Sequence, residues 1–192
     1  MLENLQNKKI ILASKSPRRQ ELLKGLGLNF EIRTRDIPED YPTNIPAEEV
    51  PLYLAEKKAN EFLPELKSDE FIITSDTIVI HDSKILEKPQ SVDHARQMLR
   101  TLADSDHLVV TGVCIQSHSK KVVFGDYTQV FFNPLTDREI EFYIENYKPF
   151  DKAGSYGAQD WIGFVAIRKL VGSYFNVMGL PVHRVYEELK KF

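Results

Sequence analysis

Two serines and two arginines near the start of the chain could together bind a phosphate group. They follow an apolar run, and Ser16 can cap a helix whose first residue is Pro17. Arg18 and Arg19 then fall in the first helical turn, where the helix dipole disfavours each cation by roughly 0.3–1 kcal/mol. A bound anion would explain both cations, because backbone amides, guanidinium groups and the hydroxyls of Ser14 and Ser16 all favour phosphate.

Asp76 is the leading catalytic candidate. It is the one charge in the apolar, β-rich run over residues 71–80. A buried, unpaired charge costs several kcal/mol, so this carboxylate needs a partner, a metal ion or a proton. An acid bonded to backbone amides at a strand end or bulge is the alternative. The basic residues elsewhere in the chain favour the catalytic interpretation.

Two lysines could supply positive charge to the same site. Lys88 precedes Pro89, which fixes the local backbone and could aim the lysine into a cleft. The alternative for Lys88 is an exposed turn residue. Lys58 lies at the rim of the apolar face of a helix expected over residues 47–63, where most lysines are simply solvated.

Glu39 and Gln159 lie in loops and have types that suit a nucleotide ligand. Glu39 belongs to an acidic, proline-rich loop and could assist Asp76 as an oxygen ligand for a divalent cation, or be a solvated loop acid. Gln159 follows two glycines and carries both a donor and an acceptor, which suits reading a nucleobase edge. A lone loop glutamine is more often simply a surface residue.

The elements that must position these residues alternate between strands and helices. We expect strands over residues 10–13, 30–35, 71–80, 108–116, 121–132 and 164–170. We expect helices over residues 18–26, 47–63, 91–102, 136–146 and 181–191, and loops over 36–46 and 152–163. The pattern indicates an α/β fold with a mixed central sheet and flanking helices.

Composition limits the function classes. A chain of 192 residues suggests one domain over residues 1–192, or two lobes sharing a sheet. The formal net charge of −3 argues against a nonspecific nucleic-acid binder. The single cysteine, Cys114, excludes an internal disulfide, and we expect it to be a buried thiol. We find no signal-like segment and no apolar run long enough to span a membrane, and we expect a cytoplasmic protein.

Ordered blocks of sequence resemble the Maf family of nucleoside triphosphate pyrophosphatases. The blocks are LASKSPRR at 12–19, LAEKKA at 54–59, SDTIV at 75–79, LEKP at 86–89, DKAGSYG at 151–157, GSY at 172–174 and GLP at 179–181. The resemblance implies an elongated, two-lobed α/β fold with a deep cleft, like that of the inosine triphosphate pyrophosphatases. It also implies cleavage of the α–β phosphoanhydride, a magnesium or manganese cofactor, and a homodimer as an open alternative, since dimers occur in the family.

Three positions of the resemblance concern the base. Arg18, Thr77 and Gln159 match the specificity positions of the dTTP/UTP-specific group, whereas the group acting on 7-methyl-GTP has glutamine and glutamate at the second and third. The chain departs from the family pattern at Ala158 and Asp160, which flank Gln159 where the family often has isoleucine and glycine. It also has Thr74-Ser75 where the family often has Gly-Ala before the aspartate. These departures bear on fine specificity rather than on the reaction.

The expected site follows from both lines of reasoning. Asp76 orients a metal-associated water and accepts its proton, with Glu39 as a second metal ligand. The residues expected to bind substrate are Ser14, Ser16, Arg18, Arg19, Lys58, Thr77, Lys88 and Gln159. The expected ligand is a nucleoside triphosphate, with no stable nucleic-acid partner and no membrane. Two alternatives stay open: a pyrophosphatase for 7-methyl-GTP or other noncanonical nucleotides, and a noncatalytic nucleotide-binding regulator of cell division.

Overall fold

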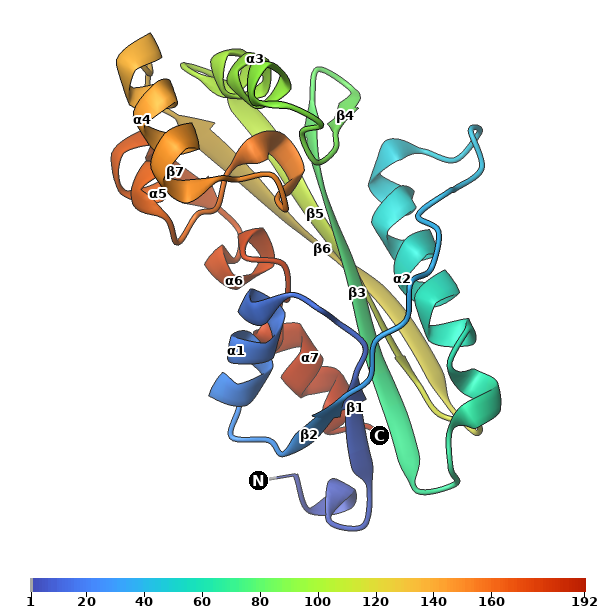
Figure 1. Ribbon diagram of the computed structural model, residues 1–192. Coiled ribbons are helices and arrows are strands. Elements are labelled where there is room, and N and C mark those ends of the chain that lie inside the picture. Colours follow the sequence, from blue (N-terminus) through green and yellow to red (C-terminus); the bar gives the residue numbers. More distant parts are fainter. Residues whose placement is uncertain (1) are drawn as a thin grey trace. The chain divides into compact units, whose positions relative to one another are not determined.

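A seven-stranded mixed sheet forms the centre of the fold in the computed structural model, which describes residues 2–192. The strands are β1 (Lys9–Leu12), β2 (Phe30–Ile32), β3 (Glu70–His81), β4 (Lys84–Leu86), β5 (Asp106–Gln116), β6 (Lys121–Phe132) and β7 (Ile167–Val171). Their hydrogen-bonded order is β2-β1-β3-β5-β6-β7, with β4 paired to β3 (Figure 1). β1 is parallel to both β2 and β3. β4 is antiparallel to β3, and β7 is antiparallel to β6. The expected α/β class with a mixed sheet is confirmed.

Helices flank the sheet in both halves of the sequence. They are α1 (Pro17–Gly25), α2 (Val50–Asn60), α3 (Val92–Leu102), α4 (Asp137–Tyr147), α5 (Trp161–Ala166), α6 (Tyr174–Val177) and α7 (Val182–Leu189). Short 3-10 helices are η1 (Glu3–Leu5), η2 (Ala47–Glu49), η3 (Leu63–Glu65) and η4 (Ala153–Ser155). Within residues 2–192, no helix combines the length and apolar character that crossing a membrane requires.

Two sequence predictions near the C-terminus are wrong in detail. The expected loop over 152–163 contains η4 and the start of α5, and the expected strand over 164–170 begins only at Ile167. Ile162 and Ala166 are both fully buried, and their four-residue spacing is that of a helix face.

Two other elements also differ from the sequence prediction. The prediction missed α6, and it extended the second strand past Ile32, where the structure ends β2.

The chain divides into two compact units. The first contains residues up to Asp76, Thr111–Asp126 and Gly179–Phe192, and the second contains Thr77–Val110 and Tyr127–Met178. The boundary therefore falls within β3, directly after the candidate catalytic aspartate. The single domain over 1–192 stays a prediction.

In the first unit, α2 packs against the sheet through small side chains. Ala55 and Ala59 of α2 join Ile11, Ile72 and Cys114 in one buried cluster, and Figure 1 shows α2 running beside β3. The expected burial of Cys114 is confirmed, and this burial raises the pKa of its thiol to about 12.

A close backbone approach fixes the position of α2 on the sheet. A Cβ atom built on Gly112 of β5 would lie 2.2 Å from the carbonyl oxygen of Pro51 in α2. No side chain fits at that distance, so glycine is required there. The approach places the helix that carries Lys58 directly against the strands.

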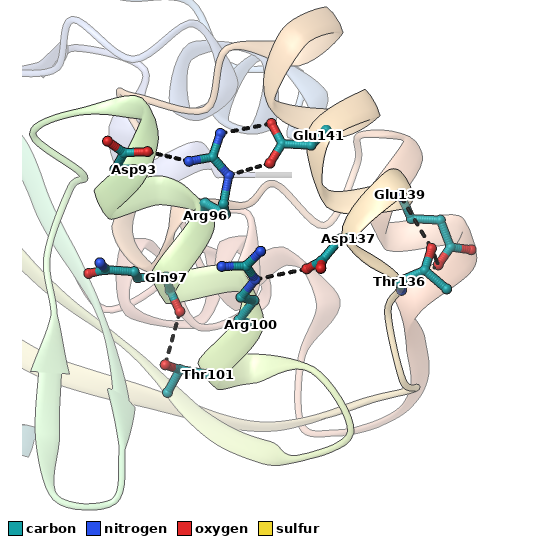
Figure 2. Close-up of polar contacts among 9 residues, drawn as sticks. All are labelled: Asp93, Arg96, Gln97, Arg100, Thr101, Thr136, Asp137, Glu139 and Glu141. Atoms are coloured by element: carbon teal, nitrogen blue, oxygen red, sulfur yellow. Dashed lines mark hydrogen bonds and ion pairs between the residues drawn. The ribbon is translucent and has the colours of Figure 1, made fainter.

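In the second unit, capping residues fix where α3 and α4 begin. Ser91 accepts a hydrogen bond from the backbone of His94, and Thr136 and Glu139 form the expected capping box. Ion pairs then join the two helices: Arg96 bonds Glu141, and Arg100 bonds Asp137 at 2.8 Å, while Arg96 also bonds Asp93 within α3 (Figure 2).

A buried ion pair anchors the start of β3 in the first unit. The carboxylate of Glu70 is 2% exposed and accepts two hydrogen bonds from Arg33, at 2.7 and 2.9 Å. These bonds lower the pKa of Glu70 to about 2. Because the pKa is lower in the folded state than its ordinary value of 4.5, the pair stabilises the fold fully above about pH 4.5 and loses that effect as pH falls through 2.

We therefore expect Arg33→Met to lower the free energy of unfolding by about 3 kcal/mol at pH 7, since it leaves a buried charge without its partner. The loss should shrink as the pH is lowered from 4.5 to 2. Urea unfolding across this range measures both effects. Arg100→Met is the control, because its pair with Asp137 is exposed and should contribute less than about 1 kcal/mol. Equal losses in the two variants would contradict the prediction.

Candidate functional site

The N-terminus of α1 presents hydroxyl groups and cations with no acidic residue in its first turn. Ser16 occupies the N-cap position ahead of Pro17, as expected, but its side chain makes no capping hydrogen bond. Ser14 is buried, its hydroxyl accepts from the backbone N–H of Ser16 at 3.2 Å, and its carbonyl accepts from Gln20 at 3.1 Å. This helix end therefore keeps the features of an anion site.

Arg19 connects α1 to the strand that carries Asp76. Its Nη1 donates to the carbonyl of Ser75 at 2.8 Å, and its Nε donates to the carbonyl of Gly179 at 2.8 Å. Burial lowers the pKa of Arg19, while the nearby carboxylates of Asp76 and Glu39 oppose that shift. The first unit thus brings a half-buried guanidinium group into electrostatic range of both candidate carboxylates.

Glu39, Lys58 and Asp76 form what we call the carboxylate–lysine cluster. The Nζ atom of Lys58 lies 2.5 Å from Oδ1 of Asp76 and 2.7 Å from Oε1 of Glu39. The side chains of Lys58 and Asp76 are 15% and 12% exposed, so solvent screens their interaction less than that of a surface pair. One lysine therefore offsets two carboxylates at the middle of β3.

The contact between β3 and α2 explains how Lys58 reaches Asp76. The hydroxyl of Thr74 donates to the carbonyl of Ala55 at 2.6 Å. Lys58 is one helical turn after Ala55, and Asp76 is two residues after Thr74 on the same face of the strand. Lys57, the residue before Lys58, contacts the exposed carboxylate of Asp40 at 2.7 Å.

Of the four remaining expected site residues, Arg18 lies in the first turn of α1 in the first unit, and the other three belong to the second unit. Thr77 follows Asp76 along β3 and is half-buried, Lys88 follows β4 and is exposed, and Gln159 is half-buried in the glycine-bearing loop. This loop lies close to the segment before Lys88, because the N–H of Gly154 donates to the carbonyl of Glu87 at 3.2 Å.

Gly154 also lies against β3. A Cβ atom built on it would come within 2.9 Å of Val79, and its φ is +66°, so glycine suits this position for two reasons. The structure thus brings Ser14, Ser16, Arg19, Glu39, Lys58 and Asp76 together in the first unit, and sets the Gln159 loop against β3 in the second.

Comparisons with known proteins identify the family of the chain. The model of the Maf family, described as Maf-like protein, matches residues 9–192. The chain belongs to the Maf family.

Several relatives of this Maf chain carry one name. The chain is 54% identical to the dTTP/UTP pyrophosphatase of Phocaeicola vulgatus, over all of both chains. It is 51% identical to the enzyme of that name in Flavobacterium johnsoniae, over 97% of this chain and 96% of the other, and 51% identical to that of Porphyromonas gingivalis, over 100% and 98%.

Among solved structures, the Staphylococcus aureus Ham1 protein matches with a TM-score of 0.49 and 14% identity, over 65% of this chain and 72% of the other. A likeness of this size is too distant to bear on the fold or the activity.

Sequence reasoning about this Maf chain missed two side chains next to Gln159. Asp160 accepts hydrogen bonds from Tyr143 at 2.7 Å and from Gln159 at 3.2 Å, and the hydroxyl of Tyr143 accepts from the backbone of Gly157 at 3.0 Å. Asp160 departs from the family pattern, which is a signal that could have drawn attention to it. Tyr143 gave no such signal, because its spacing is that of any core residue of a helix.

Proposed function

We propose that the chain is a nucleoside triphosphate pyrophosphatase that hydrolyses dTTP and UTP to the nucleoside monophosphate and pyrophosphate. The observation that carries the proposal is the carboxylate–lysine cluster, in which the buried Asp76 is held by Lys58 beside Glu39. The names of relatives about 50% identical over the full chain give the substrate class.

The first unit supplies positive charge and hydrogen-bond donors for the triphosphate. We assign the phosphate oxygens to Arg18, Arg19 and Lys58, with the hydroxyls of Ser14 and Ser16 and the amides at the start of α1. Because Arg19 is fixed by two backbone carbonyls, it does not have to reorganise as charge develops. Preorganised charge of this kind is often the largest contribution to catalysis.

Asp76 is proposed as the proton acceptor. Its Oδ1 atom is bonded to Lys58, which fixes the plane of the carboxylate. Its second oxygen can then take a proton from a water molecule that attacks the α-phosphorus, and pyrophosphate leaves. A pure phosphate-binding protein gains nothing from a carboxylate at this place, so Asp76 favours hydrolysis over simple binding.

The donor set suits magnesium or manganese. Residues 2–192 contain no group of three or more His, Cys, Asp or Glu side chains arranged for a metal ion. Magnesium, however, is usually held by one or two carboxylates together with substrate phosphates, and Asp76 and Glu39 provide two carboxylates at one lysine. When bound, such a cation draws charge from the phosphates and lowers the pKa of water.

We assign recognition of the base to Thr77 and Gln159, and we also assign a phosphate-binding role to Lys88. The Oε1 atom of Gln159 is buried and has no hydrogen-bond partner anywhere in residues 2–192. A buried carbonyl without a donor is costly, so a ligand donor at this atom would be strongly favoured. A cytoplasmic location and a homodimer stay predictions.

Product analysis on a panel of triphosphates tests the proposal. With magnesium, the purified protein should release pyrophosphate and the monophosphate from UTP and dTTP at least tenfold faster, by kcat/KM, than from CTP, GTP or 7-methyl-GTP. Binding of UTP without turnover would contradict the proposal and favour a nucleotide-binding regulator. A preference for 7-methyl-GTP would contradict the substrate class alone.

A further inference from the structure

Asp160 stands at the N-cap position of α5 but does not cap the helix. Its side chain makes no hydrogen bond to the first turn, although aspartate is among the best N-cap residues. Instead, Oδ2 accepts from the hydroxyl of Tyr143 at 2.7 Å, and Oδ1 accepts from Nε2 of Gln159 at 3.2 Å. The carboxylate is therefore directed toward Gln159.

Tyr143 fixes the carboxylate in this orientation. Tyr143 is fully buried in α4, and its hydroxyl oxygen accepts from the N–H of Gly157 at 3.0 Å. Burial raises the pKa of Tyr143, so the hydroxyl keeps its proton and must donate it to Asp160. Lys152, whose Nζ atom lies 3.7 Å from Oδ2, supports the negative charge of Asp160.

The loop backbone presses against the same pair of side chains. A Cβ atom built on Gly157 would lie 2.6 Å from Oδ2 of Asp160 and 2.7 Å from Nε2 of Gln159. Only glycine leaves room for the two polar groups. The amide of Gln159 is thus held from two directions, by a hydrogen bond and by packing.

These contacts determine which end of the Gln159 amide is directed away from Asp160. A carboxylate only accepts hydrogen bonds, so the amide must turn its NH₂ group toward Asp160. Its oxygen, Oε1, then points away, and this buried atom has no hydrogen-bond partner within residues 2–192. The arrangement therefore directs the amide oxygen, a hydrogen-bond acceptor, away from Asp160 and leaves it available to a ligand.

We propose that Asp160, held by Tyr143, is a positioning residue that selects pyrimidine bases with a ring N–H, namely uracil and thymine, over cytosine by fixing the orientation of the Gln159 amide. The inference rests on the proposed function, because it names how that activity discriminates between pyrimidines. Cytosine carries a lone pair at N3, so two acceptors would face each other and its triphosphate is rejected.

Asp160→Asn tests the proposal with almost no change in shape. The Tyr143 hydroxyl must still donate, so the asparagine oxygen turns to Tyr143 and its NH₂ group turns to Gln159. The Gln159 amide then reverses and offers its NH₂ group to the base. We expect the ratio of kcat/KM for UTP over CTP to fall at least tenfold, mainly through KM, a change that lost stability alone would not produce.

Two further variants complete the experiment. Asp104→Asn removes the same charge from an exposed residue, paired with Arg168 at 3.6 Å, and should leave the ratio unchanged. Tyr143→Phe removes only the hydroxyl that holds Asp160 and should also lower the ratio, so it decides the matter if Asp160→Asn does not fold.

The outcomes separate this inference from the proposed function. If the wild-type protein prefers UTP but both Asp160→Asn and Tyr143→Phe keep its UTP-to-CTP ratio, the positioning role of Asp160 is wrong and the pyrophosphatase stands. If the wild-type protein releases no pyrophosphate from UTP, both are wrong.

Discussion

Asp76→Asn is expected to lower kcat for pyrophosphate release from UTP by roughly 10²–10⁴-fold, the usual contribution of a positioned proton acceptor. Asparagine has nearly the same size, and its side-chain oxygen can still accept from Lys58, which lies 2.5 Å from Oδ1 in the wild-type protein. The fold should therefore survive, while the group that takes the proton is gone. Steady-state kinetics with magnesium and UTP measures the loss, and circular dichroism checks the fold.

Asp69→Asn is the matched control for this variant. Asp69 lies next to the start of β3 and pairs with Lys9 at 3.7 Å, but its side chain is 42% exposed. The Asp69→Asn variant removes the same charge from the same unit as Asp76→Asn, and we expect its activity to stay within twofold of the wild type. Comparable kcat values for Asp76→Asn and Asp69→Asn would refute the role of Asp76.

Lys58→Met is expected to lower kcat by about 10²–10³-fold, the typical effect of removing one preorganised donor. Methionine fills much of the same volume, but Asp76 and Glu39 then face each other without the cation that separates them. The variant should also unfold at a lower temperature, because a buried carboxylate loses its partner. Kinetics and thermal unfolding of the same preparation measure the two effects.

The adjacent residue provides the control. Lys57→Met removes a lysine from the same helix. The partner of Lys57 is Asp40, which is exposed. The kcat of Lys57→Met should stay near the wild-type value. If Lys58 acted only as a structural counter-ion, kcat per folded molecule would be unchanged at a temperature where Lys58→Met is fully folded, and that result would exclude its role in catalysis.

Much of the fold is predictable from the sequence because local signals agree with it. Ser91 and Thr136 mark helix starts by their caps, and the long apolar run around Asp76 reads as a central strand; all three are confirmed. The errors lie where local patterns are short. Ile162 and Ala166 have helical spacing, but six residues give too few turns to outweigh the nearby glycine loop.

The candidate site also has a part that the sequence predicts and a part that depends on tertiary packing. Asp76 was recognisable because a charge in an apolar strand demands an explanation, whereas the pairing of Lys58 with both Asp76 and Glu39 depends on how α2 sits against β3. The hydrogen bond from Thr74 to Ala55 fixes this packing, and the spacing of residues in the sequence does not predict it. Asp160 could be noted as unusual in its family, but its role depends on Tyr143, which lies 17 residues away in the chain.

Hydrolysis of UTP in ¹⁸O-labelled water tests whether Asp76 activates water for attack at the α-phosphorus. Mass spectrometry of the products shows which phosphorus received the water oxygen. We predict one ¹⁸O atom in the uridine monophosphate and none in the pyrophosphate, with label transfer nearly absent in Asp76→Asn. Label in pyrophosphate, or release of orthophosphate from the wild-type protein, would contradict the proposed reaction.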